Sequence, residues 1–351
     1  MTQLGVAVVG AGVVGRMRAA AAARHPRLRL VAVADLDESR ARAAVAGTSA
    51  EAMVDPRRVL DRNDVDAVIV ATPGHEHEPV AVDALKSGRH VLCEKPLAPD
   101  LQACRRIVAA AAAAKRTLAV GFNHRYYPCV KRLKDAIDGG AIGTVDHVRA
   151  LAGHPGLHEF RAEWMYRRPM SGGGAMMDVG IHMTDLVRFA VGEIAQVVGV
   201  CSERVWNVAG SEDNALAIMT TASGTPIRYQ ATWSEWKGYR LALEVYGSRG
   251  MAGAYYAPMM NLVVTTDDTR RRRVRRIHLH PWINVREKLR GWETTATLAF
   301  AEELTDFVRL IAGEPSRIAD GRAGLLAVSV ANAVYESSAT GRSVTIADAG
   351  P

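Results

Sequence analysis

The sequence predicts an α/β protein in which a doubly wound, parallel-stranded domain precedes an α+β domain with a large, mostly antiparallel open sheet. Three observations predict this fold class. Short apolar runs alternate with helical segments from residue 4 to 120, a glycine motif separates the first run from the first helix, and strand-like segments dominate from 196 to 279. Because 351 residues give room for about two domains, we expect one domain over 1–121 and a second over 122–351.

The first domain is predicted from apolar runs that are hydrophobic at nearly every position. Strands buried on both faces have this pattern, which is typical of parallel sheets covered by helices. The runs are Leu4–Val9, Leu28–Ala34, Ala67–Ala71, His90–Cys93 and Thr117–Val120. The helical segments between them are Val14–Arg24, Glu38–Ala46, Glu78–Lys86 and Leu101–Ala114.

The strand–helix alternation breaks after residue 121. A helix at Val130–Asp138 and a strand at Thr144–Ala150 precede a loop rich in proline, histidine and glycine, and a helix follows from about 176 to 191. Strands joined by short turns come next, which predicts an antiparallel sheet. They are Val197–Arg204, Asn214–Thr221, Pro226–Ser234, Arg240–Tyr246, Leu262–Thr266 and Val274–Leu279. The helices Ala299–Ile311 and Gly324–Thr340 end the chain.

The net charge of +7 does not indicate nucleic-acid binding, since much of it lies in one basic stretch, Arg270–Arg276. No apolar run approaches the roughly 20 residues of a membrane-spanning helix. The N-terminal segment lacks the basic start of a secretory signal. The four cysteines show no C-x-x-C spacing, which disfavours zinc and redox pairs and fits reduced thiols. We therefore expect a cytoplasmic protein with no membrane or nucleic-acid partner.

A glycine motif, G-x-G-x-x-G, follows the first predicted strand and opens the first helix. In that context the first glycine permits a tight turn, the second lets backbone N–H groups approach a pyrophosphate, and the third lets the helix pack on the strand. The helix N-terminus then faces the phosphates. The motif predicts an NAD(P)-binding Rossmann domain whose loop residues contact the cofactor. These residues are Gly10, Gly12, Val13, Val14 and Gly15.

Asp35 ends the second predicted strand, 20 residues after the last glycine. A carboxylate there accepts the hydroxyls of the adenosine ribose and repels a 2′-phosphate, so NAD is favoured and NADP is the less favoured cofactor. Arg40, one turn into the next helix, could reach a phosphate of the cofactor. Its alternative interpretation is a solvated residue on the helix surface.

Two further motifs narrow the class. One contains Thr72-Pro73, His77 and then Glu94-Lys95-Pro96, and the other runs from Gly172 to Asp185 with the spacing D-x-G-x-H-x-x-D. Together with the glycine motif, and in the same order along essentially the whole chain, they closely resemble the Gfo/Idh/MocA family, which is named after glucose–fructose oxidoreductase, inositol dehydrogenase and rhizopine-catabolism proteins.

The resemblance implies a tightly held nicotinamide cofactor and a sugar, cyclitol or related polyol as substrate. It also implies a homodimer or homotetramer that assembles through the open sheet of the second domain. On the cofactor side, Glu94 would contact the nicotinamide ribose, and Lys95 would be catalytic while touching both cofactor and substrate. The residues that would line the cofactor groove are Thr72, Pro73 and His77, with Asn123 beside the nicotinamide.

On the substrate side, the resemblance makes Asp178 and His182 the catalytic pair. Arg125 would contribute from the segment that crosses between the domains. Trp164 and Arg167 belong to a segment that tends to face substrate, but here it departs from the family's W-R-x-D-P pattern, because Met165 replaces the usual arginine and Arg167 the usual aspartate. The substrates of well-studied members therefore do not carry over.

The residues themselves support this chemistry. Hydride removal from an alcohol needs a base for the hydroxyl proton and a positive charge near the forming carbonyl. Lys95 follows a buried strand at the edge where open α/β sheets bind ligands. Asp178, His182 and Asp185 would share one face of a helix, and histidine exchanges protons near neutrality. Asp185 could instead support the helix or Arg188.

We therefore expect an NAD(H)-dependent oxidoreductase that acts on a hydroxyl, or the corresponding ketone, of a sugar, amino sugar or cyclitol. Three alternatives stay open: an NADPH-dependent ketoreductase of nucleotide-activated sugars in secondary metabolism, a glycosidase acting by transient oxidation, and a non-catalytic nucleotide-sensing protein. A zinc site at His75, His77, Asp178 and His182 lacks completing ligands, so we expect no metal.

Overall fold

The computed structural model describes residues 3–159, 162–266 and 272–347, and it divides into two compact units. Unit 1 comprises residues 1–126 and 292–325, and unit 2 comprises residues 127–291 and 326–351. The expected division at residue 121 places the segment 292–325 in the second domain, whereas it packs within unit 1. The physical reason is the apolar face of the helix in that segment, which is buried against the helices and strands of unit 1.

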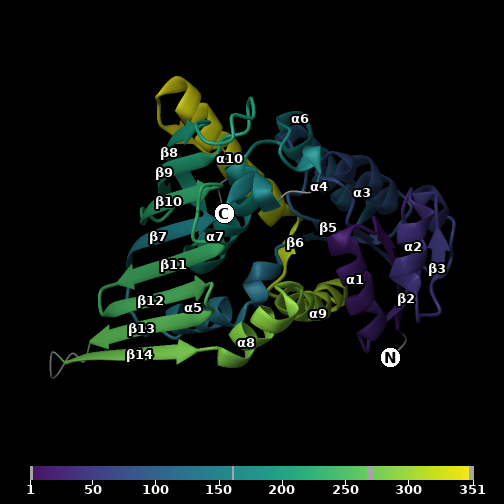
Figure 1. The fold of residues 1–351 in the computed structure, drawn as a ribbon, viewed down its shortest axis with the longest axis horizontal. Coiled ribbons are helices and arrows are strands. Elements are labelled where there is room, and N and C mark those ends of the chain that lie inside the picture. The colour runs from purple at the N-terminus through teal and green to yellow at the C-terminus, as the bar shows by residue number, and fades with distance from the viewer. Residues whose placement is uncertain (1–2, 160–161, 267–271, 348–351) are drawn as a thin grey trace. The chain divides into compact units, whose positions relative to one another are not determined.

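Unit 1 contains a seven-stranded sheet in the order β15-β6-β5-β4-β1-β2-β3 (Figure 1). All its pairs are parallel except β15 with β6. The strands are β1 (Leu4–Val9), β2 (Leu28–Ala34), β3 (Glu51–Met53), β4 (Ala67–Val70), β5 (His90–Glu94), β6 (Leu118–Gly121) and β15 (Ala319–Asp320). The five strands expected from the apolar runs are confirmed within one residue at each end. Strand β1 lies between β2 and β4, so the strand order reverses direction at β1, as in a doubly wound sheet.

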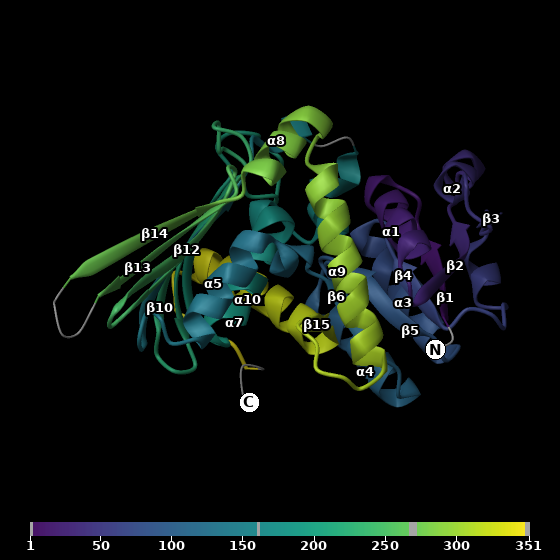
Figure 2. The same cartoon turned by 90° about the horizontal axis from the view of Figure 1, so that it is seen from below.

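Four helices of unit 1 agree with the expected segments within one residue at each end, whereas α9 (Glu293–Ile311) begins at Glu293 rather than at Ala299. These four helices are α1 (Val13–Arg24), α2 (Glu38–Val45), α3 (His77–Lys86) and α4 (Leu101–Ala114). Figure 2 shows α9 alongside α1, and the two helices pack together. Phe300, Leu304 and Phe307 of α9 are nearly fully buried in the same core as Val6 and Ile69 of the sheet.

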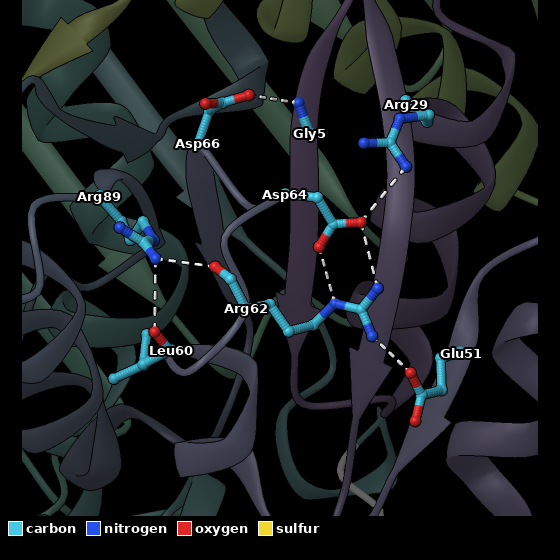
Figure 3. A network of polar contacts seen from close by, with 8 residues as sticks. All are labelled: Gly5, Arg29, Glu51, Leu60, Arg62, Asp64, Asp66 and Arg89. Carbon is cyan, nitrogen blue, oxygen red and sulfur yellow. Dashed lines mark hydrogen bonds and ion pairs between the residues drawn. The ribbon is translucent and has the colours of Figure 1, made fainter.

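A polar network joins the amino ends of β1, β2 and β3 (Figure 3). The glycine motif follows the carboxyl end of β1, at the opposite edge of the sheet. Arg62 donates to Asp64 and pairs with Glu51 of β3, while Asp64 also pairs with Arg29 of β2. Asp66 accepts from the backbone N–H of Gly5 at 2.7 Å. These contacts join neighbouring strands where no ligand site is expected, so we interpret them as structural.

Unit 2 is built on a nine-stranded sheet in the order β14-β13-β12-β11-β7-β10-β9-β8-β16. The sheet is antiparallel as predicted, with one exception: β7 and β10 are parallel neighbours. The strands are β7 (Val145–Gly153), β8 (Ile194–Ser202), β9 (Asn214–Thr221), β10 (Pro226–Thr232), β11 (Arg240–Gly247), β12 (Gly250–Tyr256), β13 (Met260–Thr266), β14 (Arg273–Leu279) and β16 (Val344–Thr345). The parallel pair matters for the site, because the chain leaves both strands at the same edge of the sheet.

Helices cover one face of this sheet and leave the other open (Figure 2). They include α5 (Pro128–Asp138) and α7 (Ile181–Val191), which contact the sheet, and α10 (Gly321–Thr340), which begins in unit 1 and continues in unit 2. On the open face, apolar side chains of β8 and β9 are about half exposed or more: Val198, Val200, Leu216 and Ile218.

Strand β12, helix α8 and the short strand β16 of unit 2 are absent from the sequence-based expectation. Strand β12 is rich in glycine and alanine rather than in β-branched residues, so its sequence carries little strand signal. Helix α8 (Pro281–Arg290) follows directly after β14, where we expected only a strand end. Of the basic stretch, Arg270 and Arg271 lie outside the described residues, while Arg272, Arg273, Arg275 and Arg276 are exposed. No helix of the described residues is long and apolar enough to cross a membrane.

Candidate functional site

The glycine loop between β1 and α1 has the shape that a pyrophosphate needs. Gly10 has φ +97°, and a Cβ there would lie 2.5 Å from the carbonyl oxygen of Ala71. A Cβ at Gly15 would lie 1.8 Å from the Gly10 carbonyl oxygen, whereas a Cβ at Gly12 would meet nothing within 4 Å. The first and third glycines are therefore required for packing, and the second faces open space.

Helix α1 leaves room for an anion at its N-terminus. Its N-cap is Gly12, which forms no side-chain cap, and its first turn, which includes Val13 and Val14, contains no acidic residue. Beside the loop, the hydroxyl of Thr72 is buried and has no hydrogen-bond partner among the described residues. A helix N-terminus with no side-chain cap, together with a buried polar atom, fits the phosphates of a dinucleotide.

Asp35 follows β2 and holds the glycine loop. Its Oδ2 accepts from the backbone N–H of Ala11 at 2.6 Å, and its Oδ1 accepts from the N–H of Asp37 at 2.9 Å. Each carboxylate oxygen keeps lone pairs for further donors. Arg40 is more than half exposed and pairs with Asp37 at 3.3 Å, which agrees with the interpretation of a solvated helix residue.

The structure corrects the expected position of His77. We expected it to line the cofactor groove, but its side chain is 1% exposed, and its two ring nitrogens contact the carbonyl oxygens of Pro96 at 2.9 Å and Thr72 at 3.0 Å. Burial lowers the pKa of His77, although the hydrogen bonds to the two carbonyl oxygens act to raise it. His77 therefore joins the loop after β4, with Thr72-Pro73, to the loop after β5 that carries Lys95, and so acts on the site through the backbone.

Glu94 at the end of β5 belongs to a buried ion network. Its Oε1 accepts from Arg18 of α1 at 2.7 Å, and Arg18 also pairs with Glu303 of α9. The Arg18 side chain is fully buried, with its guanidinium 3.9 Å from the centre of the Phe300 ring. Burial raises the pKa of Glu303 to about 7, in opposition to the charge of Arg18. The network ties the phosphate-facing helix to the residue before Lys95.

Lys95 follows β5 and is partly exposed. Burial, and after it the positive charge of Lys95, lowers the pKa of His124 to about 3. His124 is therefore neutral near pH 7 and does not compete for a proton. Asn123 is buried, and Arg125 is 9% exposed and donates to the carbonyl oxygen of Arg317 at 2.9 Å.

In unit 2, Asp178 accepts from two side chains that the sequence analysis did not single out. Its Oδ2 lies 2.7 Å from Nε2 of His154 and 3.0 Å from Nε1 of Trp233. His154 follows β7 and Trp233 follows β10, and these parallel strands are in register at Gly153 and Thr232. The parallel pair thus delivers both donors to one carboxylate, which is 22% exposed.

We expected Asp178 and His182 to lie on one regular α-helix, but they do not. Residues Met176–Gly180 form a π-helical turn, and His182 lies at the start of α7. The hydroxyl of Tyr229 donates to the Gly180 carbonyl oxygen at 2.6 Å and holds this turn on the sheet. Such π-turns are frequent at functional sites because they redirect side chains. Asp185 is fully buried, and Arg188 pairs with Glu193.

The glycine triplet before this turn is explained by a buried carboxylate. Glu212 accepts from the N–H groups of Gly174 at 2.8 Å and Met176 at 2.7 Å, and from the hydroxyl of Tyr335 at 3.0 Å. A Cβ at Gly173 would lie 2.0 Å from that hydroxyl. Burial raises the pKa of Glu212, although the hydrogen bonds from the two backbone N–H groups act to lower it. Glu212 therefore fixes the backbone that presents Asp178.

The segment Trp164–Pro169, which departs from the family's W-R-x-D-P pattern, lies on the surface. Trp164 is partly buried in a short 3-10 turn. Arg167 is 57% exposed and pairs with Glu163 at 2.8 Å. In the described part of the chain, no group of three or more histidine, cysteine, aspartate or glutamate residues is arranged to hold a metal ion.

Residues 4–122 match the family described as "Oxidoreductase family, NAD-binding Rossmann fold", and residues 130–253 match the "GFO/IDH/MocA C-terminal domain". "Inositol 2-dehydrogenase 4" of Saccharopolyspora erythraea is 35% identical over 257 residues, which is 71% of this chain and 73% of that protein. This chain belongs to the GFO/IDH/MocA oxidoreductase family.

Other proteins similar to this GFO/IDH/MocA protein cover nearly all of it. "Inositol 2-dehydrogenase" of Rhizobium meliloti is 29% identical over 348 residues, which is 97% of this chain and 98% of that protein. The crystal structure of an oxidoreductase domain protein from Kribbella flavida superposes with a TM-score of 0.86 at 29% identity, covering 99% of this chain and 100% of that one. The expected family and fold class are thus confirmed, and the cofactor of its Rossmann domain is NAD.

Proposed function

We propose that this protein oxidises a secondary hydroxyl of a sugar, amino sugar or cyclitol with NAD, or reduces the corresponding ketone. The observation that carries the proposal is the Asp178 carboxylate, held by two N–H donors one turn before His182. A fixed, partly exposed carboxylate is suited to accept substrate hydroxyls. The names of the inositol 2-dehydrogenases among its relatives support a polyol substrate.

In the proposed reaction NAD supplies the hydride acceptor. The loop residues Gly10, Gly12 and Gly15 would hold its pyrophosphate, and Asp35 its adenosine ribose. Lys95 would hold the substrate oxygen and stabilise its negative charge in the transition state. His182 would take the hydroxyl proton, and Asp178 would orient the substrate or the imidazole. The Arg18 network and His77 would keep the loop that carries Lys95 in place.

We also propose that two or four copies assemble through the open face of the nine-stranded sheet. The exposed apolar residues of β8 and β9 support this, since contiguous apolar patches on a sheet mark protein contacts. Light scattering of the wild type and of Ile218→Lys tests it. We expect a dimer or tetramer that the substitution dissociates.

The substrate proposal is tested by NADH fluorescence with purified protein and NAD across a panel of cyclitols, sugars and amino sugars. We expect substrate-dependent NADH formation with at least one of them and a strong preference for NAD over NADP. Lys95→Ala serves as the inactive control. Turnover only of nucleotide-activated ketosugars with NADPH would contradict the proposal.

A further inference from the structure

Two tryptophans form an exposed corner at the edge of the sheet where Asp178 lies. The Trp236 side chain is 63% exposed, and its ring centre lies 5.9 Å from that of the partly buried Trp206, with 48° between the ring planes. Val205, beside Trp206 in the chain, is also exposed. Large apolar side chains that cluster on a surface indicate a binding site rather than chance exposure.

The tryptophan corner is connected to Asp178 by a short series of contacts. Trp206 donates through Nε1 to the carbonyl oxygen of Trp233 at 3.0 Å, and Trp233 donates through Nε1 to Asp178 at 3.0 Å. On the neighbouring segment, the N–H of Glu235 donates to the carbonyl oxygen of His154 at 3.2 Å, one residue before Trp236. Hydrogen bonds therefore connect the tryptophan corner to the Asp178 carboxylate and fix the position of one relative to the other.

Gly156 makes this construction possible. It has φ +72°, and a Cβ there would lie 2.2 Å from Nε1 of Trp206. Its backbone N–H also donates to Nδ1 of His154 at 3.0 Å. The same turn thus seats the Trp206 ring and orients the histidine that donates to Asp178.

We propose that Trp206 and Trp236 form a platform for a second ring of a carbohydrate substrate, so that the substrate class is a glycoside or disaccharide rather than a single cyclitol ring. This inference rests on the proposed function, which places the reacting ring at Asp178. The C–H face of a pyranose is apolar and flat and stacks on an indole, while its hydroxyl edge stays in water. Two indoles at an open angle can contact one ring from two sides.

The test measures binding and turnover separately, with the NAD-loaded protein. Glucose and myo-inositol serve as one-ring probes, and maltose and cellobiose as α- and β-linked two-ring probes. Affinities come from calorimetry and KM values from NADH fluorescence. The variant is Trp236→Ala, which removes an exposed side chain, and the matched control is Trp282→Ala, because Trp282 is 84% exposed on α8.

We expect the wild type to bind one of the disaccharides more tightly than glucose. Trp236→Ala should lower the affinity for that disaccharide about tenfold, which is about 1.4 kcal/mol. It should change the affinities for the one-ring probes less than twofold. Trp282→Ala should change neither. Equal effects of Trp236→Ala on one- and two-ring probes, or no preference of the wild type for a disaccharide, would overturn the platform. UDP-glucose as a further probe decides the chemistry, since tighter, Trp236-dependent binding of it would assign the corner to a nucleobase instead.

Failure of the platform is distinguishable from failure of the proposed function. If no probe yields NADH but disaccharide binding depends on Trp236, the dehydrogenase proposal fails and the carbohydrate site stands. If glucose or myo-inositol is oxidised but Trp236→Ala affects all probes alike, the dehydrogenase stands and the platform fails.

Discussion

His154 donates through Nε2 to the Asp178 carboxylate. Its Nδ1 accepts the backbone N–H of Gly156 at 3.0 Å, so the proton of the ring must be on Nε2, which lies 2.7 Å from Oδ2 of Asp178. A backbone N–H cannot turn into an acceptor, so this hydrogen bond selects the tautomer. Trp233 adds a second donor that never loses its proton. Asp178 is thus held by two N–H donors, one after each of the parallel strands β7 and β10.

Removing one of these donors should lower kcat/KM for the substrate and leave the affinity for NAD unchanged. Trp233→Phe deletes the Nε1–H, and a hydrogen bond to a charged group contributes about 1.5–3 kcal/mol. We expect kcat/KM to fall about ten- to a hundredfold, with NAD affinity within twofold of the wild type by fluorescence quenching. Trp282→Phe is the control. A kcat/KM near the wild-type value would show that Trp233 does not position the carboxylate.

Asp35→Ser should narrow the preference for NAD over NADP. The substitution removes the charge that repels a 2′-phosphate, and we expect the ratio of the two kcat/KM values to fall at least about tenfold. Because Asp35 also accepts from Ala11 and Asp37, the affinity for NAD itself should fall. Asp35→Asn keeps an acceptor for the loop and separates the two effects. A wild type that prefers NADP would refute the role of Asp35 and point to Arg40.

Glu303 should make stability depend on pH. Burial raises its pKa to about 7, above the value of the unfolded chain, so between about pH 5 and 7 the native state holds a proton that the unfolded state has lost. Stability from this group is therefore present at low pH and is lost as the pH rises through 7, by up to about 3 kcal/mol. Glu303→Gln cannot ionise.

The measurement is urea unfolding of the wild type and Glu303→Gln in parallel at pH 5, 6 and 7. The difference in unfolding free energy should shift in favour of the variant as the pH rises. Contributions of the buried His77 and His124, whose pKa values burial lowers, have the opposite sign but are common to both proteins. Parallel pH profiles would contradict the assignment.

Much of the fold was predictable because its elements carry local signals. The parallel strands are continuous apolar runs, and the helices of unit 1 have clear boundaries, so the observed α4 coincides with the prediction at both ends. Strand β12 escaped because Gly250, Ala252, Gly253 and Ala254 have little strand preference, and it forms through pairing with β11 and β13. The packing of α9 into unit 1 depends on contacts far apart in the chain, which no local pattern contains.

The candidate site was predictable only where a motif marks it. The glycines, Asp35, Lys95, Asp178 and His182 stand in recognisable spacings. The residues that support them do not stand in a recognisable spacing. Arg18 and Glu303 resemble other charged residues on helices, and His154 lies in a loop. A histidine directly after β7 and a tryptophan directly after β10 would have been a usable signal had the parallel pairing of these strands been known.

The central claim is that Lys95 and His182 carry the chemistry, and the kcat of His182→Ala measured beside its NAD affinity tests it most directly. General acid–base groups contribute about 10²–10⁴-fold in rate. We expect a loss of that size in His182→Ala, and likewise in Lys95→Ala, with NAD binding retained, and we expect the rise of the wild-type oxidation rate with pH to disappear in His182→Ala. A near-normal kcat in His182→Ala would contradict the account and move the proton transfer to Lys95 or to Tyr166.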